Sequence, residues 1–155
     1  MITFDALIIR EKHINDKNRI LTVLTKEYGV ISVFCRGGMK PTSKTVGSTQ
    51  LFSYSEFCVD EKTDSKGMKR YYLDSSKTKT IFYRIRLDVI SASLASYIAE
   101  LINYCGVADG DNEEVLRLAL NTYYSLNCDR QPPELLKSIF EIRFLFEIGF
   151  RPNLI

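Results

Sequence analysis

The spacing of apolar residues changes once along the chain, near residue 80, and this change constrains the fold more than any other feature. Up to that point apolar and polar residues alternate with the period of two that is typical of half-buried β-strands. From about residue 82 onward, apolar residues recur at three- and four-residue steps, the period of amphipathic helices. We therefore expect an α+β protein with a β domain over residues 1–80 and a helical domain over residues 81–155.

Five short segments of the first half have the pattern of strands. The second and third of them are joined by the sequence KEYG, whose glycine suits a tight turn, and this pair is expected to form a hairpin. Five short strands favour a small closed barrel over a sandwich, because closure removes exposed sheet edges. The expected strands span residues 2–11, 19–25, 30–36, 51–61 and 68–75.

Three helices are expected in the second half. The first runs from about residue 82 until Gly106 ends it, and the second begins after the capping-box pattern of Asp111 and Glu114. The third begins at Pro132 and Pro133, and its apolar residues cover nearly the whole circumference. We expect this third helix to be buried on several sides, with further chain or a second copy covering what these elements leave open.

Charge divides the chain at the same place as the apolar pattern. Residues 1–80 hold 14 Lys and Arg against 9 Asp and Glu, whereas residues 81–155 hold 7 against 10, although the net charge of the whole chain is only +2. A basic β domain beside an acidic helical one predicts a polyanionic partner for the first half alone.

Basic residues of the first half gather around the expected turns, where loops of a small barrel converge on one surface and can follow a phosphate backbone. Gly37 and Gly38 would let backbone amides approach an anion. Phe52, Tyr54, Tyr71 and Tyr72 are the available platforms for stacked bases, although some of them must fill the barrel. The candidate DNA-binding residues are Arg10, Lys12, Lys17, Arg19, Arg36, Lys40, Lys44, Lys69 and Arg70, with Lys66, Lys77 and Lys79 nearby.

The sequence offers little for catalysis. Its one histidine, His13, lies in a polar turn, and the phosphate-loop, dinucleotide, zinc-protease and serine-hydrolase motifs are missing. The four cysteines lack metal-ligand spacing and are expected to be free, mostly buried thiols: Cys35, Cys58, Cys105 and Cys128. Because the catalytic motifs are missing, we expect a non-enzymatic protein without cofactors. Because the first residues do not form a signal peptide, we expect it in the cytoplasm.

Two stretches near the N-terminus form a distinctive series, ALIIR at residues 6–10 and NDKNRILTVLTKEYGVISVFCRGGMKPTSK at residues 15–44. In order and spacing they resemble the RecO family of bacterial DNA repair proteins, which act as recombination mediators. Within the second stretch the matching positions are Asp16, Leu24, Thr25, Gly29, Arg36, Gly37, Lys40 and Ser43. The resemblance continues in residues 51–59, 71–76, 82–101 and 140–154.

The resemblance implies an OB-fold barrel followed by a helical domain. It also implies binding of single- and double-stranded DNA, annealing of complementary strands, and recombinase loading with RecR on DNA coated by single-strand binding protein. The acidic tail of that protein would dock on the helical part, where the candidate cations are Arg84, Arg86, Lys137 and Arg143.

Two departures and two alternatives accompany this interpretation. Family members continue beyond the GFRPNL segment, many into a cysteine-rich zinc site, and none of the four cysteines aligns with that site, so no metal ligand is expected. Gly38 and Met39 also stand where further basic or small residues are usual. The alternatives are a protein-interaction module without nucleic-acid binding, and a generic OB-fold module that binds RNA.

Overall fold

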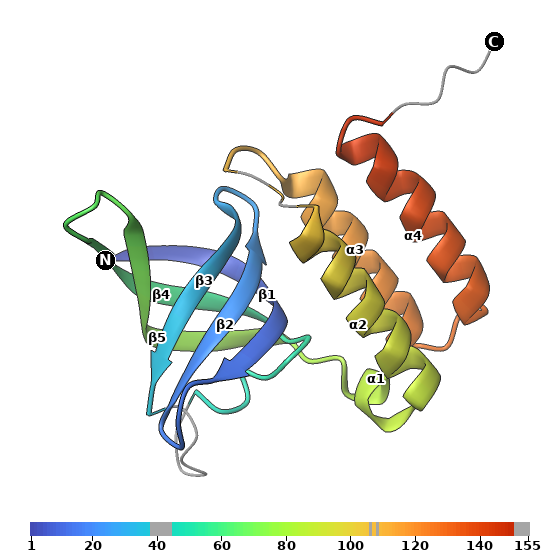
Figure 1. The fold of residues 1–155 in the computed structure, drawn as a ribbon. Helices are drawn as coiled ribbons and strands as arrows, with labels where there is room; N and C mark the ends of the chain where they lie inside the picture. The colour runs from blue at the N-terminus through green and yellow to red at the C-terminus, as the bar shows by residue number, and fades with distance from the viewer. Residues whose placement is uncertain (38–44, 106, 108, 151–155) are drawn as a thin grey trace.

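The computed structural model describes residues 1–37, 45–105, 107 and 109–150. Within these ranges five strands form a closed barrel, and helices follow in the second half (Figure 1). The expected α+β fold with an N-terminal OB-fold barrel is confirmed by this arrangement. None of the described helices has the length and apolar character of a membrane-spanning segment.

Four of the five strands are longer than the sequence pattern predicts, especially the last, whereas the fourth begins three residues later than expected and is one residue shorter. Their order around the barrel is β1-β2-β3-β5-β4, with parallel pairing between β3 and β5 and antiparallel pairing elsewhere. The second and third strands form the expected hairpin. Gly29, with a φ of 65°, is the first residue of the third strand. The strands are β1 (Ile2–His13), β2 (Asn18–Thr25), β3 (Gly29–Arg36), β4 (Tyr54–Thr63) and β5 (Lys69–Thr80).

The barrel interior is a closed apolar cluster. Every second residue of each strand points inward, and Phe57, Leu21 and Val33 are fully buried there. A bulge in β1 between Ile8 and Arg10 changes the pairing with β2. Before the bulge, simple alternation places Ile8 in the barrel interior and Ile9 outside it against the helices. Beyond the bulge, Arg10 pairs with the outward-facing Thr22.

The first expected helix is divided into two. Asp88 has an extended backbone between them, and its carboxylate accepts hydrogen bonds from the backbone amide of Ser91, at 2.9 Å, and from its hydroxyl, at 2.7 Å. Asp88 thus caps a new helix and interrupts the old one. The described helices are α1 (Tyr83–Leu87), α2 (Val89–Tyr104), α3 (Glu113–Asn127) and α4 (Pro133–Glu147).

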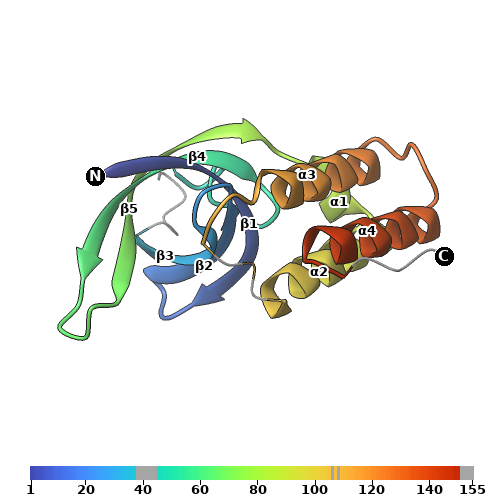
Figure 2. The ribbon, with the colours of Figure 1, turned by 90° about the horizontal axis from the view of Figure 1, so that it is seen from above.

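The helices form a layer against one side of the barrel, while the β4–β5 hairpin projects on the side away from them (Figures 1 and 2). A second core cluster joins the two halves, with Leu7, Ile9 and Leu24 from the strands packed against α2 and α3. Tyr123 is fully buried at this junction, and its hydroxyl donates to the carbonyl oxygen of Ala95 at 2.9 Å.

Helix α4 is buried on one side by the described part of this chain, and the further cover expected for its other sides stays a prediction. Its buried residues are Leu136, Phe140 and Phe144, and among the described elements α3 and α2 pack most closely against it. On its other sides Ile142 is 58% exposed and Leu145 is 47% exposed. Helix α4 therefore carries apolar side chains on its open side as well as on its buried side.

Candidate nucleic-acid interface

The barrel presents one open outer face, on the part of β1, β2, β3 and β5 that the helices leave uncovered. Strand pairing places Lys12 beside Ile20, Ile20 beside Phe34, and Phe34 beside Tyr72, so that one row crosses four strands. At about 4.8 Å per strand this row is roughly 14 Å long. Arg10, which pairs with Thr22, lies on the same face two residues from Lys12 and is exposed.

The exposed cations on this face keep their charge unpaired. Arg10, Lys12 and Arg36 form no ion pair with any residue in the described ranges. Such guanidinium and ammonium groups are available to phosphate oxygens without first losing a carboxylate partner. The structure therefore brings together three of the cations that the sequence nominated.

Lys17 and Arg36 are held at the same end of this face. The side chain of Asn15 shapes the β1–β2 turn by accepting from the amide of Lys17 at 3.0 Å. The amide of Gly37, which has a φ of 67°, donates to the carbonyl oxygen of Lys17 at 2.6 Å. The expectation that this amide approaches an anion is therefore wrong, because it is already used to join two turns. Gly38, Lys40 and Lys44 lie outside the described residues.

The two cations of the β4–β5 hairpin that were assigned to DNA binding are partly neutralised. Lys69 lies 3.2 Å from the carboxylate of Glu61, and a hydrogen bond from this pair raises the pKa of Lys69. Arg70 lies 3.4 Å from Asp64. Backbone amides at the hairpin tip hold the pKa of Asp64 below its ordinary value, so this acid stays charged beside Arg70. Lys69 and Arg70 are exposed, but each shares its charge with an acid.

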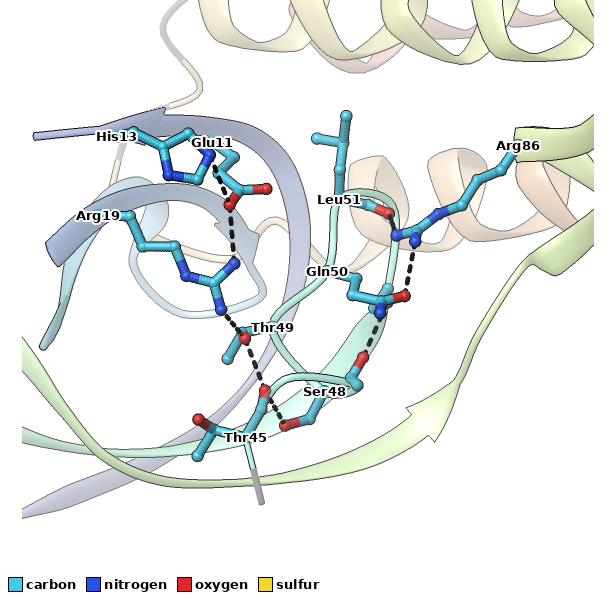
Figure 3. Close-up of polar contacts among 11 residues, drawn as sticks. Glu11, His13, Arg19, Thr45, Ser48, Thr49, Gln50, Leu51 and Arg86 are labelled. Carbon is cyan, nitrogen blue, oxygen red and sulfur yellow. Dashed lines mark hydrogen bonds and ion pairs between the residues drawn. The ribbon is translucent and has the colours of Figure 1, made fainter. Parts of the chain in front are cut away.

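Arg19 does not lie on the open face, which corrects its assignment from the sequence. It belongs to the inward-pointing positions of β2 and is only 5% exposed. Its guanidinium donates to Glu11 at 2.8 Å and to the hydroxyl of Thr49, and Thr49 in turn donates to the carbonyl oxygen of Thr45 at 2.6 Å (Figure 3). Arg19 therefore closes the end of the barrel and holds the connection that follows β3.

The aromatic residues separate into core and surface groups. Phe52 is 5% exposed and Tyr71 is 7% exposed, so both belong to the core, as was expected of part of this set, and neither is open to a stacked base. Tyr54 donates to Asp5 at 3.2 Å, and burial, followed by the nearby Asp5, raises its pKa to about 12. Tyr72 alone among the four nominated aromatics lies on the open face.

Sequence reasoning missed Phe34 on the open face and Lys62, which reaches that face from β4. Phe34 stacks on Tyr72 with ring centroids 5.3 Å apart, and the ammonium group of Lys62 lies 5.3 Å from the Tyr72 centroid. Arg36 contacts the same ring at 5.1 Å. Alternation along β3 places Phe34 and Arg36 on one face, which was a usable signal, but the neighbour on β5 depends on the parallel pairing.

The four cations nominated for partner binding do not meet in one place. Arg86 donates to the side chain of Gln50 at 2.6 Å and to the carbonyl oxygen of Leu51 at 2.5 Å, so it joins α1 to the barrel (Figure 3). Lys137 pairs with Glu141 at 2.9 Å, whereas Arg143 lines a cavity of about 540 Å³ between α3 and α4. Arg84 is exposed on α1.

A larger groove separates the barrel from α2. It has a volume of about 700 Å³, and Ile9, Leu51 and Phe52 form part of its apolar lining. Arg10 lines its edge, so this groove opens beside the cationic face. None of the four cysteines, all of them in the described ranges, forms a disulfide, and Cys105 is exposed rather than buried.

Two protein-family models match this chain, one over the strands and one over the helices. A family described as Recombination protein O N terminal matches residues 1–78, and one described as Recombination protein O C terminal matches residues 86–155. The chain belongs to the RecO family. The family resemblance of the sequence is therefore confirmed, and the two RecO regions correspond to the strands and to the helices from Arg86 onward.

Individual relatives agree with this RecO assignment. The protein named DNA repair protein RecO from Acetivibrio thermocellus is 32% identical over 148 residues, which cover 95% of this chain and 57% of the relative. Those from Halalkalibacterium halodurans and Caldicellulosiruptor bescii are each 29% identical over 150 residues, covering 97% of this chain and 57% and 59% of the relatives. This RecO chain thus spans less than two thirds of the length of these relatives.

Among solved structures, a chain from a Replication Protein A heterotrimer bound to single-stranded DNA is similar in fold. The match has a TM-score of 0.38 and 14% identity, and covers 64% of this chain and 70% of that chain.

Proposed function

We propose that this RecO family member is a DNA repair and recombination mediator whose barrel binds the phosphate backbone of single- and double-stranded DNA through its open face. The observation that carries the proposal is the register that places Arg10, Lys12 and Arg36 on one face without ion-pair partners in the described residues. Membership of the RecO family supports a role in repair and recombination.

The proposed mechanism is electrostatic and non-enzymatic. Cations on the barrel neutralise the backbone charge of one strand, which lowers its repulsion from a complementary strand while its base edges stay free to pair. Annealing follows from bringing two such strands together. In the cytoplasm the protein would act with RecR to load recombinase on DNA coated by single-strand binding protein, whose acidic tail would meet the helical part.

The first prediction tests the cationic face. The triple variant Arg10→Ala, Lys12→Ala, Arg36→Ala should bind a labelled single-stranded oligonucleotide at least about tenfold more weakly near 0.1 M salt, because three phosphate contacts are lost. The slope of log affinity against log salt should become shallower by about 2 units, at roughly 0.7 per contact. Fluorescence anisotropy over a salt series measures both quantities.

The matched control removes three cations elsewhere, in the variant Lys26→Ala, Lys79→Ala, Arg117→Ala. Each of these residues is paired with an acid, at 2.9, 2.5 and 2.5 Å, and the change in net charge is the same. The control should bind DNA with a nearly unchanged salt slope. Equal losses in the two variants would show that only total charge matters and would contradict the assigned face.

The same assay separates the alternatives. A protein-interaction module would bind a labelled acidic-tail peptide but no oligonucleotide. A generic RNA-binding module would bind RNA more tightly than DNA of the same sequence, because contacts to the 2′-hydroxyl favour RNA. Either result would replace the DNA-mediator proposal.

A further inference from the structure

The open face carries a pair of stacked aromatic rings that have no role in the core. Phe34 on β3 and Tyr72 on β5 lie side by side in the parallel pairing, with ring centroids 5.3 Å apart and planes inclined by 27°. Both are half-buried, so part of each ring is open to solvent. The other aromatic contacts of the barrel, such as that of Phe4 with Tyr71, belong to its interior.

Two cations cover the Tyr72 ring. The guanidinium carbon of Arg36 lies 5.1 Å from its centroid, and the ammonium nitrogen of Lys62 lies 5.3 Å from it. Asp60 is the pairing neighbour of Tyr72 on β4, yet neither cation lies within ion-pair distance of it or of another described acid. These cations are held by the ring rather than by a carboxylate, and exposed contacts of that kind are weak.

We propose that Phe34 and Tyr72 form a base-stacking subsite that makes this face prefer single-stranded over double-stranded DNA. The inference rests on the proposed DNA-binding function and adds the part of the ligand that is recognised. An unpaired base can lie against an aromatic ring, whereas the bases of a duplex are already stacked on one another. A duplex therefore gains only the phosphate contacts, and a single strand gains those contacts together with stacking.

The cations beside the rings complete the subsite. When a base lies against the Tyr72 ring, Arg36 and Lys62 move from the ring to the phosphates on either side of that nucleotide. This exchange replaces two weak cation–ring contacts by charge-assisted hydrogen bonds. A protein partner fits this surface less well, because two aromatic rings surrounded by unpaired cations offer little contiguous apolar area.

The test compares ligands that share phosphates but differ in their bases. The variant Phe34→Leu, Tyr72→Leu keeps apolar side chains on the face and removes the rings. It should bind an oligo-dT strand about 5- to 30-fold more weakly than the unchanged protein, the usual effect of losing a stacked base. Its affinity for an abasic sugar-phosphate strand of equal length, and for a duplex, should change by less than about twofold.

A second variant reports contact directly. The chain has no tryptophan, so Tyr72→Trp places a single indole at the subsite. Its fluorescence should be quenched by oligo-dT and remain unchanged on binding the abasic strand. The matched control is Tyr83→Trp, because Tyr83 is 65% exposed on α1, and its fluorescence should respond equally little to both strands.

The outcomes separate this inference from the proposed function. Unchanged oligo-dT affinity in the leucine variant, with loss of binding in the triple cation variant, would overturn the stacking subsite and leave the proposed function standing. Equal losses on oligo-dT and on the abasic strand would also overturn it, since the rings would then act only through the cations. Absence of DNA binding by the unchanged protein would overturn the proposed function itself.

Discussion

At the scale of single residues, two cations at the same end of one hairpin lie in different surroundings. Arg19 near the start of β2 is 5% exposed, whereas Arg36 at the end of the neighbouring β3 is exposed. Position 19 shares the inward parity of Leu21, and the open end of a barrel needs a long side chain there to meet Thr49. A basic residue near a turn is therefore a phosphate contact only when the parity of its strand points it outward.

Arg19→Met tests the structural role of this buried cation. The substitution removes the guanidinium from Glu11 and Thr49, which keep their contacts with His13 and Thr45. The free energy of unfolding should fall by about 2–4 kcal/mol, somewhat less than for a fully buried pair because Glu11 is partly exposed. Urea denaturation measures this change. Arg117→Met is the control, because the Arg117 pair with Glu114 is exposed and its loss should leave stability unchanged. Similar effects of the two substitutions would contradict the role of Arg19.

At the scale of elements, a side-chain cap decided where α2 begins. The period of apolar residues is continuous from residue 82 to residue 105, so the pattern alone predicts one helix. Asp88 breaks that helix, because its carboxylate satisfies the amide of Ser91 when its own backbone is extended. Helix α4, by contrast, begins at Pro133 as expected, since proline suits a first helical position.

The Asp88 cap predicts a dependence of stability on pH. Hydrogen bonds from Ser91 lower the pKa of Asp88 in the folded state, so its contribution is present above the unfolded pKa and is lost as pH falls through the lower folded pKa. Asp88→Ala should lower Tm by about 2–4 °C at pH 7. This difference should disappear in strongly acidic solution, where the carboxyl group of the unchanged protein is protonated.

Asp88→Asn supplies the control for the charge. Asparagine caps helices about as well as aspartate, so thermal unfolding followed by circular dichroism should show nearly the original Tm at pH 7. The pH dependence that Asp88 contributes should be missing from this variant. A Tm of Asp88→Ala that stays equally low at every pH would show that the carboxylate is not the cap.

At the scale of the whole molecule, the barrel and the helices share a hydrophobic core and are not independently packed domains. Tyr123 of α3 makes edge-to-face contacts with Phe52, at 5.4 Å, and with Phe82, at 5.9 Å. These two partners lie before β4 and after β5, so the helices are fixed to the barrel at both ends of its last hairpin. Complete burial raises the pKa of the Tyr123 phenol, which therefore stays a hydrogen-bond donor.

Substitution of Tyr123 should separate packing from hydrogen bonding at this junction. Tyr123→Phe removes only the bond to Ala95 and should cost about 1 kcal/mol. Tyr123→Ala leaves a cavity and should cost about 3–5 kcal/mol. Urea denaturation gives both values, and hydrogen exchange should show α2 and α3 losing protection before the barrel in Tyr123→Ala. Equal costs would mean that the ring packing contributes little.

The sequence by itself determined the type of each element. The spacing of apolar residues distinguishes strands from helices and the KEYG turn indicates one hairpin, because both signals lie within a few neighbouring residues. The order of the segments along the chain carries the family resemblance, which implies the OB-fold. It also nominated Arg10, Lys12 and Arg36, which the structure places on one open face.

Only the tertiary structure decided which nominated residues share that face. Alternation in a strand defines two faces, but barrel closure and register choose which one is inside, and these depend on partners distant in sequence. Phe34 and Tyr72 meet through the parallel pairing of β3 with β5, Arg19 is drawn inside, and Tyr71 becomes core. The residue pattern of one strand does not tell which strand lies beside it, and the candidate site is formed by residues of neighbouring strands.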